Sequence, residues 1–296
     1  MKVPSNKAID IYKYYRDLLT DLYGPEEASS LMAILFEHYL AMKRHEILSG
    51  SARRLSESEL LKIHFAVKDL LKQRPVQYIT GTTWFYDNQF KVTPDVLIPR
   101  PETEELCDWI IKDAKIPTTT TTHPQILDIG TGSGCIAITL KLNIEKAQVT
   151  ALDLSEAALQ IAKSNATTNK ADIDFMQVDI LNPTEWPEKT FDIIVSNPPY
   201  VCESEKELMK PNVLEHEPHL ALFVSNENPL VFYDAIARFA HQRLSDYGRL
   251  YFEINENLSS ELEELLQNIG FKQIEFRKDL NNKIRMVSCQ LINPKE

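Results

Sequence analysis

Short apolar runs alternate with helical patterns from residue 125 to residue 291, and this alternation constrains the fold more than any other feature. The apolar runs predict strands at 125–129, 148–153, 173–179, 191–197 and 249–254. The patterns between them predict helices at 135–142, 155–169, 229–244 and 260–269. Such alternation is typical of an α/β fold with a doubly wound, parallel sheet. Two closing strands, 271–278 and 283–291, meet at Asn281-Asn282 and make the last strand antiparallel, so we expect a mostly parallel seven-stranded sheet.

The first 75 residues have a different pattern and predict a small N-terminal helical domain. Glu26–Leu48 has the spacing of one long amphipathic helix. The segment Ser56-Glu57-Ser58-Glu59 is a capping-box signature that opens a second helix, which Pro75 ends. Residues 76–99 alternate with period two around Gly81 and predict a β-hairpin linker. We therefore expect domains at 1–75, 76–99 and 100–296. The sequence leaves open whether the helical domain only supports the rest or docks a partner.

The third domain is expected to begin with a helix that runs to about Lys115. Pro101 suits a first helical turn, and the acidic residues just behind it complement the helix dipole. Pro117 and the five threonines 118–122 then predict a low-complexity surface loop. We interpret this loop as a tolerated insertion.

A glycine-rich turn follows the first strand of the alternating region and leads straight into a helix. The turn reads Asp128-Ile129-Gly130-Thr131-Gly132-Ser133-Gly134. Glycines at such a turn let the backbone approach a ligand closely, and the helix N-terminus adds N–H donors. A dinucleotide site needs a glycine where this chain has Cys135. The spacing therefore disfavours a dinucleotide and favours a ligand without a pyrophosphate.

Acidic residues end the next two strands. Asp153 follows the glycine turn by 19 residues. A carboxylate at this position can accept hydrogen bonds from both ribose hydroxyls of a nucleoside. Its alternative role is a helix cap, which Ser155 is placed to take instead. Asp179 ends the following strand and is predicted to meet an adenine amino group. Ile180 is predicted to cover one face of the ring.

The segment Asn197-Pro198-Pro199-Tyr200 ends the strand at 191–197. Neither proline has an N–H, so the segment cannot continue a sheet ladder or enter a helix interior. The carbonyls of Asn197 and Pro198 stay free to accept hydrogen bonds. With a carboxamide at one end and an aromatic ring at the other, the segment suits a planar NH2 group. Taken alone, it could also be only a rigid turn.

The charge and the cysteines narrow the function classes. The formal net charge is −11, and residues 76–296 carry 20 basic against 33 acidic side chains, which disfavours non-specific nucleic-acid binding. The cysteines 107, 135, 202 and 289 form no C-x-x-C pair and are expected to be free thiols in a reducing compartment. No apolar leader or membrane-spanning stretch is visible, so we expect a soluble, cytoplasmic protein. His216 and His219 are interpreted as surface or core histidines, and no metal is expected.

Together these motifs resemble the class I S-adenosylmethionine-dependent methyltransferases. The Asn-Pro-Pro-Tyr segment narrows the resemblance to enzymes that methylate a planar nitrogen. Four further segments are similar to the HemK/PrmC family, whose members modify the glutamine of the Gly-Gly-Gln motif in peptide-chain release factors. These segments are Arg74–Gly81, Phe90-x-Val92, Leu97–Glu104 and Glu217-Pro218-x-x-Ala221-Leu222. The chain departs from the family's usual pattern at Val224–Pro229 and at Asn255, which follows Glu253-Ile254.

The resemblance implies S-adenosylmethionine as cofactor, with S-adenosylhomocysteine as product, and a release factor as partner. The implied cofactor-binding residues are Gly130, Thr131, Gly132, Ser133, Gly134, Asp153, Asp179, Ile180 and Asn197. The implied catalytic residues are Asn197, Pro198, Pro199 and Tyr200. Oxygens of Asn197 and Pro198 would accept the two hydrogens of the substrate amide, and Tyr200 or an aromatic beside it would pack on the amide plane.

Two other functions compete with this interpretation. One is a nucleic-acid adenine amino methyltransferase that uses the same Asn-Pro-Pro-Tyr segment; it would need a basic groove, which the acidic body disfavours. The other is a non-catalytic module that binds a nucleotide and a partner; it should have lost part of the glycine turn or of the Asn-Pro-Pro-Tyr segment, and both are intact. We expect a monomer that binds neither nucleic acid nor membrane.

Overall fold

The computed structural model describes residues 5–49, 52–115 and 123–291, and the chain forms two compact units. The N-terminal unit extends to Gly81 and includes Lys210–His216. The second unit contains Thr82–Met209 and the chain from Glu217 onwards. The sequence had suggested a boundary at residue 75 and a linker at 76–99. The loop expected at 117–122 lies outside the described residues.

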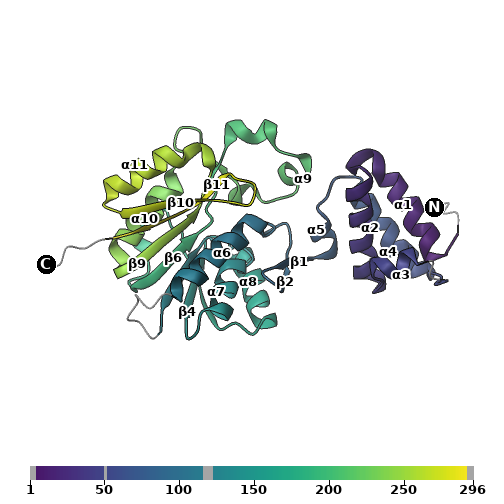
Figure 1. Cartoon of the computed structure of the whole chain (residues 1–296), viewed down its shortest axis with the longest axis horizontal. Coiled ribbons are helices and arrows are strands. Elements are labelled where there is room, and N and C mark those ends of the chain that lie inside the picture. The colour runs from purple at the N-terminus through teal and green to yellow at the C-terminus, as the bar shows by residue number, and fades with distance from the viewer. Residues whose placement is uncertain (1–4, 50–51, 116–122, 292–296) are drawn as a thin grey trace. The chain divides into compact units, whose positions relative to one another are not determined.

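The N-terminal unit is helical, as expected (Figure 1). Its helices pack around buried side chains, among them the aromatic pair Tyr12 and Phe36. Its helices are α1 (Ala8–Tyr23), α2 (Pro25–Leu40), α3 (Arg44–Leu48), α4 (Glu57–Leu70) and α5 (Val76–Thr80). The capping box at the start of α4 is confirmed. Ser56 Oγ accepts from Glu59 N, and Ser56 N donates to Glu59 Oε2.

Two expectations for this region were wrong. The long helix predicted over Glu26–Leu48 is broken after Leu40, where Ala41 adopts the left-handed conformation with φ of 49°. Arg53 Nη1 donates to the freed Leu40 carbonyl at 2.7 Å, which stabilises that helix end. The stretch before Gly81, which was expected to be extended, forms helix α5. Gly81 ends this helix in the left-handed conformation that is typical of a glycine after a helix.

A β-hairpin follows α5 and opens the second unit. It joins β1 (Thr82–Phe85) to β2 (Asn88–Lys91), which pair antiparallel. Tyr86 and Asp87 form the turn with positive φ angles of 46° and 61°. The hairpin is therefore shorter than the stretch that the sequence suggested for it.

The second unit is built on a seven-stranded sheet in the described part of the chain, with strand order β10-β11-β9-β6-β3-β4-β5. The strands are β3 (Gln125–Ile129), β4 (Gln148–Asp153), β5 (Ile173–Gln177), β6 (Phe191–Ser196), β9 (Leu244–Glu253), β10 (Lys272–Lys278) and β11 (Ile284–Gln290). Strands β5, β4, β3, β6 and β9 run parallel, and β11 pairs antiparallel with β9. The predicted fold class is confirmed. The two-residue strands β7 (Val201–Cys202) and β8 (Phe223–Val224) pair apart from this sheet.

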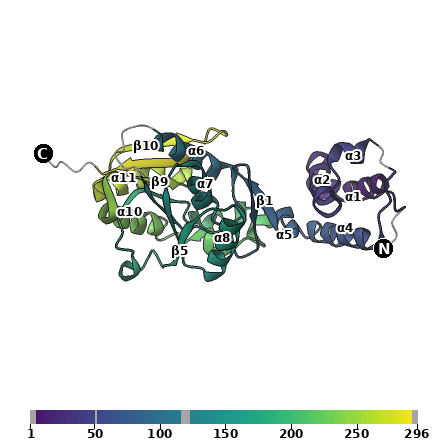
Figure 2. The same ribbon diagram turned by 90° about the horizontal axis from the view of Figure 1, so that it is seen from below.

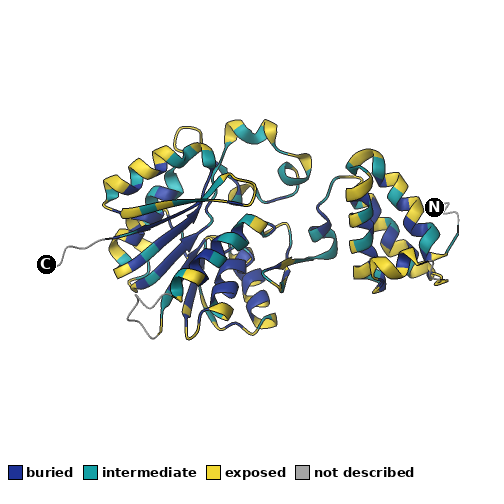
Figure 3. Ribbon diagram, in the orientation of Figure 1, coloured by how far each residue is buried: buried dark blue, intermediate teal, exposed yellow. Residues whose placement is uncertain are grey.

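Helices cover both faces of the sheet (Figures 1 and 2). One face carries α6 (Pro101–Ala114) and α7 (Cys135–Asn143), with α8 (Glu156–Thr168) next to α7. The other face carries α10 (Val231–Arg243) and α11 (Ser259–Ile269). Figure 3 shows the central strands as the most buried part of the unit, as expected for strands covered on both faces. Shorter helices in the connections of this unit are η1 (Pro183–Glu185), η2 (Glu203–Leu208), η3 (His219–Ala221) and η4 (Glu256–Leu258), whereas α9 (Pro211–Leu214) belongs to the N-terminal unit.

The strand order reverses direction at β3, which pairs with β4 on one side and with β6 on the other. The register places Ile129 opposite Leu152 and also opposite Ser196. Three strands therefore end together at one edge of the sheet. In doubly wound sheets, ligands bind outside the carboxyl ends of the strands at such a reversal.

The geometry of the glycine turn between β3 and α7 predicts how alanine substitutions there change the free energy of unfolding. Gly130 and Gly134 both have positive φ, so alanine at either position costs about 1–2 kcal/mol of backbone strain. An added Cβ at Gly134 would also lie 3.2 Å from Ala162 Cβ, whereas at Gly130 it would meet nothing within 4 Å. Chemical denaturation should therefore show a larger loss of unfolding free energy for Gly134→Ala than for Gly130→Ala. Equal losses would contradict close packing of the turn on α8.

Candidate functional site

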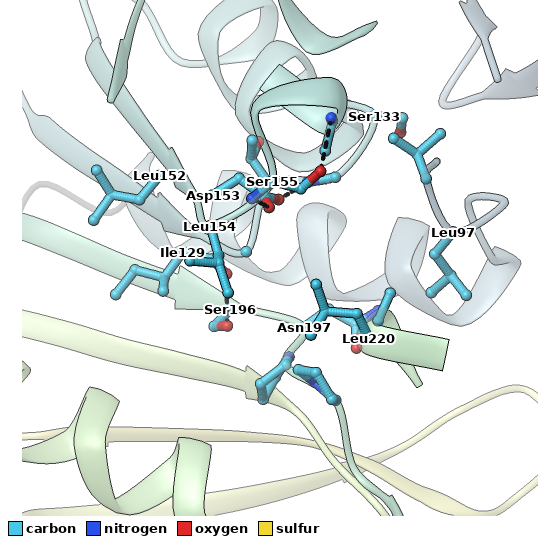
Figure 4. A pocket seen from close by; sticks show the side chains of 18 of the residues that line it. Leu97, Ile129, Ser133, Leu152, Asp153, Leu154, Ser155, Ser196, Asn197 and Leu220 are labelled. Carbon is cyan, nitrogen blue, oxygen red and sulfur yellow. Dashed lines mark hydrogen bonds between the residues drawn. The ribbon is translucent and has the colours of Figure 1, made fainter. Parts of the chain in front are cut away.

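A cavity of about 340 Å³ opens where β3, β4 and β6 end (Figure 4). This volume lies within the range of small-molecule sites. Its wall combines the glycine turn, the acidic strand ends and the Asn197–Pro199 segment. The chain thus brings together motifs that are more than 60 residues apart in the sequence.

The glycine turn is held open by hydrogen bonds at its base. The N–H groups of Gly130 and Thr131 both donate to the Leu152 carbonyl at 2.9 Å. The buried Asp128 carboxylate accepts from Thr131 Oγ1 at 2.6 Å and from Ala137 N at 3.2 Å, so it fastens the turn to the start of α7. Burial raises the pKa of Asp128 to about 7. No role had been predicted for Asp128, although an acidic residue inside a buried strand indicates a specific hydrogen-bonding role.

Asp153 lies across from this turn, at the end of β4. Its Oδ2 accepts from Gly132 N at 2.8 Å, and its Oδ1 accepts from Ser155 N at 2.9 Å. Ser155 Oγ caps α8 by accepting from Ala158 N, the role that the sequence predicted for it. Each Asp153 oxygen retains a lone pair for a further donor. Burial raises the pKa of Asp153.

Most of the residues implied to bind the cofactor line the cavity. They are Gly130, Thr131, Gly132, Ser133, Asp153, Asp179, Ile180 and Asn197. Gly134 is not among the lining residues; with φ of 82° it forms the N-cap of α7 instead. Asp179 Oδ1 accepts from Leu181 N at 2.9 Å, which turns the chain so that Ile180 lies in the wall.

The Asn197–Pro199 segment forms another part of the wall. Ser196 Oγ donates to the Ile129 carbonyl at 2.7 Å and ties the segment's start to the neighbouring strand. Asn197 Nδ2 donates to Thr103 Oγ1 at 3.3 Å, and no described residue donates to Asn197 Oδ1. The amide oxygen is therefore available to a ligand.

Tyr200 does not line the cavity, unlike the other three residues of its motif. Its ring packs against the core on the α10 side of the sheet, and its hydroxyl donates to Glu253 Oε1 at 2.9 Å. The prediction that Tyr200 packs on a bound amide thus finds no support in this position. The hydrogen bond to Glu253 explains this position, and no role had been predicted for Glu253.

An ion pair joins two of the quoted family motifs at the rim. Arg100 Nη2 contacts Glu217 Oε1 at 2.6 Å, and Ile98 N donates to Glu217 Oε2 at 3.3 Å. Arg100 lines the cavity, as does Pro218 beside the buried Glu217. The pair therefore fixes two segments of the rim to each other. Charge burial of this kind requires good geometry and additional hydrogen bonds, which Ile98 N supplies.

The cavity's chemistry fits the S-adenosylmethionine that the family resemblance implied. The Asp153 carboxylate retains acceptor capacity for the two ribose hydroxyls. Ile180 offers an apolar surface for a purine ring, and the glycines of the turn carry no side chains to block a ligand's approach. These residues would hold the nucleoside end of the molecule.

The described ranges contain neither a metal-binding cluster nor a membrane-spanning helix. No group of three or more His, Cys, Asp or Glu residues is arranged there to hold a metal ion. His216 Nε2 contacts the Lys72 carbonyl at 3.1 Å, and His219 packs edge-on against Phe223. None of the described helices combines the length and the apolar character that crossing a bilayer requires.

Known proteins resemble the chain in both of its parts. Residues 10–81 match the family described as PrmC N-terminal domain, and residues 114–219 match the methyltransferase small domain. A methyltransferase from Pyrococcus furiosus shares the fold with a TM-score of 0.51 at 16% identity, over 79% of this chain and 98% of that one.

Curated relatives match along nearly the whole chain. The release factor glutamine methyltransferase of Flavobacterium psychrophilum is 44% identical over 91% of this chain and 94% of its own length. The protein of the same name from Bacteroides thetaiotaomicron is 40% identical over 94% of this chain and 98% of its own. With identity at this level over both parts of the molecule, the chain belongs to the release factor glutamine methyltransferase family.

Proposed function

We propose that this enzyme methylates the side-chain amide nitrogen of the glutamine in the Gly-Gly-Gln motif of peptide-chain release factors, with S-adenosylmethionine as donor. The observation that carries the proposal is the position of Asn197. Asn197, whose Oδ1 accepts from no described residue, lines the same cavity as the glycine turn and Asp153. An acceptor for an NH2 group thus lies beside a nucleoside-binding wall. The names of the relatives supply the substrate class.

The binding wall determines where the donor is held. Bound S-adenosylmethionine supplies a methyl group on positively charged sulfur, which makes that methyl an electrophile. The Asp153 oxygens would accept hydrogen bonds from the ribose hydroxyls, and Ile180 would cover the adenine. The Asp128 carboxylate keeps the glycine turn in place, because it fastens both Thr131 and Ala137. None of these residues takes part in bond making.

The Asn197–Pro199 segment acts on the acceptor amide. An amide nitrogen is a poor nucleophile because its lone pair is delocalised into the carbonyl. Asn197 Oδ1 and the Pro198 carbonyl accept its two hydrogens, which orients the lone pair towards the methyl group. The same oxygens stabilise the positive charge that grows on nitrogen during transfer, and the methylated amide becomes neutral when one of the two hydrogens leaves as a proton to solvent. The two prolines keep these acceptors rigid, since each fixes its own φ.

The first test compares substrates. Purified enzyme should transfer a labelled methyl group to an intact release factor and not to a release factor whose motif glutamine is replaced by alanine. Duplex and single-stranded DNA are the second control, because the competing function would methylate adenine. Label on DNA, or on the alanine-substituted factor at the same rate, would contradict the proposal.

Two variants should separate binding from transfer. Asp153→Ala should raise the dissociation constant for S-adenosylmethionine at least about tenfold in calorimetry, because hydrogen bonds to a charged group are worth about 1.5–3 kcal/mol each. Asn197→Ala should leave cofactor binding mostly intact and lower kcat about 100-fold or more, as loss of one aligned polar group at a reacting centre does.

Asp174→Ala is the matched control, because Asp174 is an exposed acid on β5 that does not line the cavity. It should change neither cofactor affinity nor kcat. The assigned roles are wrong if Asp153→Ala binds the cofactor normally, or if Asn197→Ala loses affinity in proportion to its rate.

We further propose that the N-terminal unit contacts the release factor outside its Gly-Gly-Gln motif. Support comes from α1, where Tyr14, Leu18 and Leu22 repeat at four-residue spacing and are 41%, 45% and 44% exposed. Residues four apart lie on one helix face, so these side chains form an exposed apolar stripe. Large apolar side chains gathered in this way are typical of protein-interaction surfaces.

The docking role predicts a substrate-dependent effect. Replacing Tyr14, Leu18 and Leu22 together by serine should raise KM for an intact release factor and leave KM for a short Gly-Gly-Gln peptide unchanged. The control is Leu48→Ser, which removes an exposed apolar residue of the same unit from a different helix. Equal effects on protein and peptide substrates would make the stripe irrelevant to docking.

A further inference from the structure

Glu253 is a buried carboxylate that the proposed transfer does not use. It ends β9, is 1% exposed and does not line the cavity. Its two oxygens accept hydrogen bonds from different partners, Thr103 Oγ1 at 2.6 Å and Tyr200 OH at 2.9 Å. Burying a carboxylate is costly unless it is fully hydrogen-bonded. The two hydroxyls stabilise its charged form and oppose the burial that raises its pKa.

Thr103 connects this carboxylate to the site. It lies in the first turn of α6, is 3% exposed and contributes to the cavity wall. A hydroxyl has one hydrogen to donate and two lone pairs. Because Thr103 gives its hydrogen to Glu253, it acts only as an acceptor towards its other neighbour, the Nδ2 of Asn197 at 3.3 Å.

The order of donors and acceptors decides which way the Asn197 carboxamide faces. If the amide were turned over, its oxygen would meet a lone pair of Thr103 with no hydrogen between them. The observed orientation instead satisfies Nδ2 and leaves Oδ1 for a ligand. Glu253 therefore influences the site indirectly. Its negative charge sets the direction of the Thr103 hydroxyl, and that direction sets the orientation of the Asn197 carboxamide.

Glu253 also holds the other end of the same segment. Tyr200 donates to it directly, and the Tyr200 carbonyl accepts from Asn255 Nδ2 at 3.2 Å. Asn255 is thus a buried polar anchor at one of the positions where the chain departs from the family pattern. Both ends of the Asn197–Tyr200 segment are consequently tied to the end of β9.

We propose that Glu253 and Thr103 are positioning residues that fix the Asn197 carboxamide with its oxygen towards the substrate amide. Tyr200 shares this task as an anchor of the segment. The inference rests on the proposed function, because it assigns Asn197 Oδ1 the task of accepting a hydrogen of the glutamine amide.

The test uses full-length Thr103→Val and Thr103→Ser. Valine has nearly the shape of threonine but cannot link Glu253 to Asn197, whereas serine retains the hydroxyl. Thr103→Val should lower kcat at least about tenfold with KM for the release factor and cofactor affinity unchanged, because small misplacements of reacting groups cost up to about 100-fold. Thr103→Ser should retain most of the wild-type kcat.

Glu253→Gln is a second variant that keeps the test decisive if Thr103→Val does not fold. A glutamine amide offers N–H donors, so the Thr103 hydroxyl no longer has to give its hydrogen to this side chain and becomes free to donate to Asn197. This variant should also lose kcat and retain cofactor affinity. Wild-type kcat in both Thr103→Val and Glu253→Gln, or equal impairment of the valine and serine variants, would overturn the inference.

A measurement without substrate separates this inference from the proposed function. The side-chain amide NMR resonance of Asn197, identified by its loss in Asn197→Asp, should shift in Thr103→Val and keep its position in Thr103→Ser. If wild-type enzyme methylates no glutamine yet this pattern holds, the positioning role of Thr103 and Glu253 stands and the proposed function fails. If glutamine is methylated and the resonance is the same in all variants, the positioning role is wrong.

Discussion

Parallel pairing of β3 with β4 on one side and with β6 on the other is the constraint on which the site depends. Ile129 lies opposite both Leu152 and Ser196, so the chain that leaves each strand enters the same space. The glycine turn, Asp153 and Asn197 follow these strands directly. A shift of one residue in either pairing would turn alternate side chains to the opposite face and separate the motifs. The cavity is thus a consequence of sheet register.

Polar side chains then convert this edge into a defined site. Asp128, Asp153 and Glu253 each accept two hydrogen bonds from the chain itself. Asp128 and Asp153 both hold the glycine turn, and Glu253 holds Thr103 and Tyr200. In this enzyme, these carboxylates serve mainly to hold backbone and side chains in place. Such pre-organisation suits methyl transfer to an amide, where the reaction depends on orientation rather than on a strong base.

Much of the fold follows from the sequence, because parallel strands buried on both faces are continuous apolar runs. Local signals were equally reliable at Ser56 and Ser155, since capping uses residues close in the chain. The break at Ala41 was not visible, because a single left-handed residue leaves the helical spacing on either side unchanged. Helix α5 was mistaken for a strand, because five residues are too few to distinguish the two periods.

The candidate site was predictable only where the residues of one short motif carry the binding groups themselves. Gly130–Ser133 of the glycine turn, Asp153 and Asn197 line the cavity. The position of Tyr200 depends on Glu253, which is 53 residues away, and the orientation of Asn197 depends on Thr103, which is 94 residues away. No local pattern reveals such partners. Glu253 was still detectable in principle, as an acid that directly follows the apolar run Leu250–Phe252.

The most direct test of the account is a crystal structure of the enzyme with S-adenosylhomocysteine and a Gly-Gly-Gln peptide. The account predicts that the glutamine amide nitrogen donates to Asn197 Oδ1 and to the Pro198 carbonyl, with Asn197 Nδ2 still on Thr103. A glutamine amide bound away from this segment, or an Asn197 that presents Nδ2 to the peptide, would contradict it.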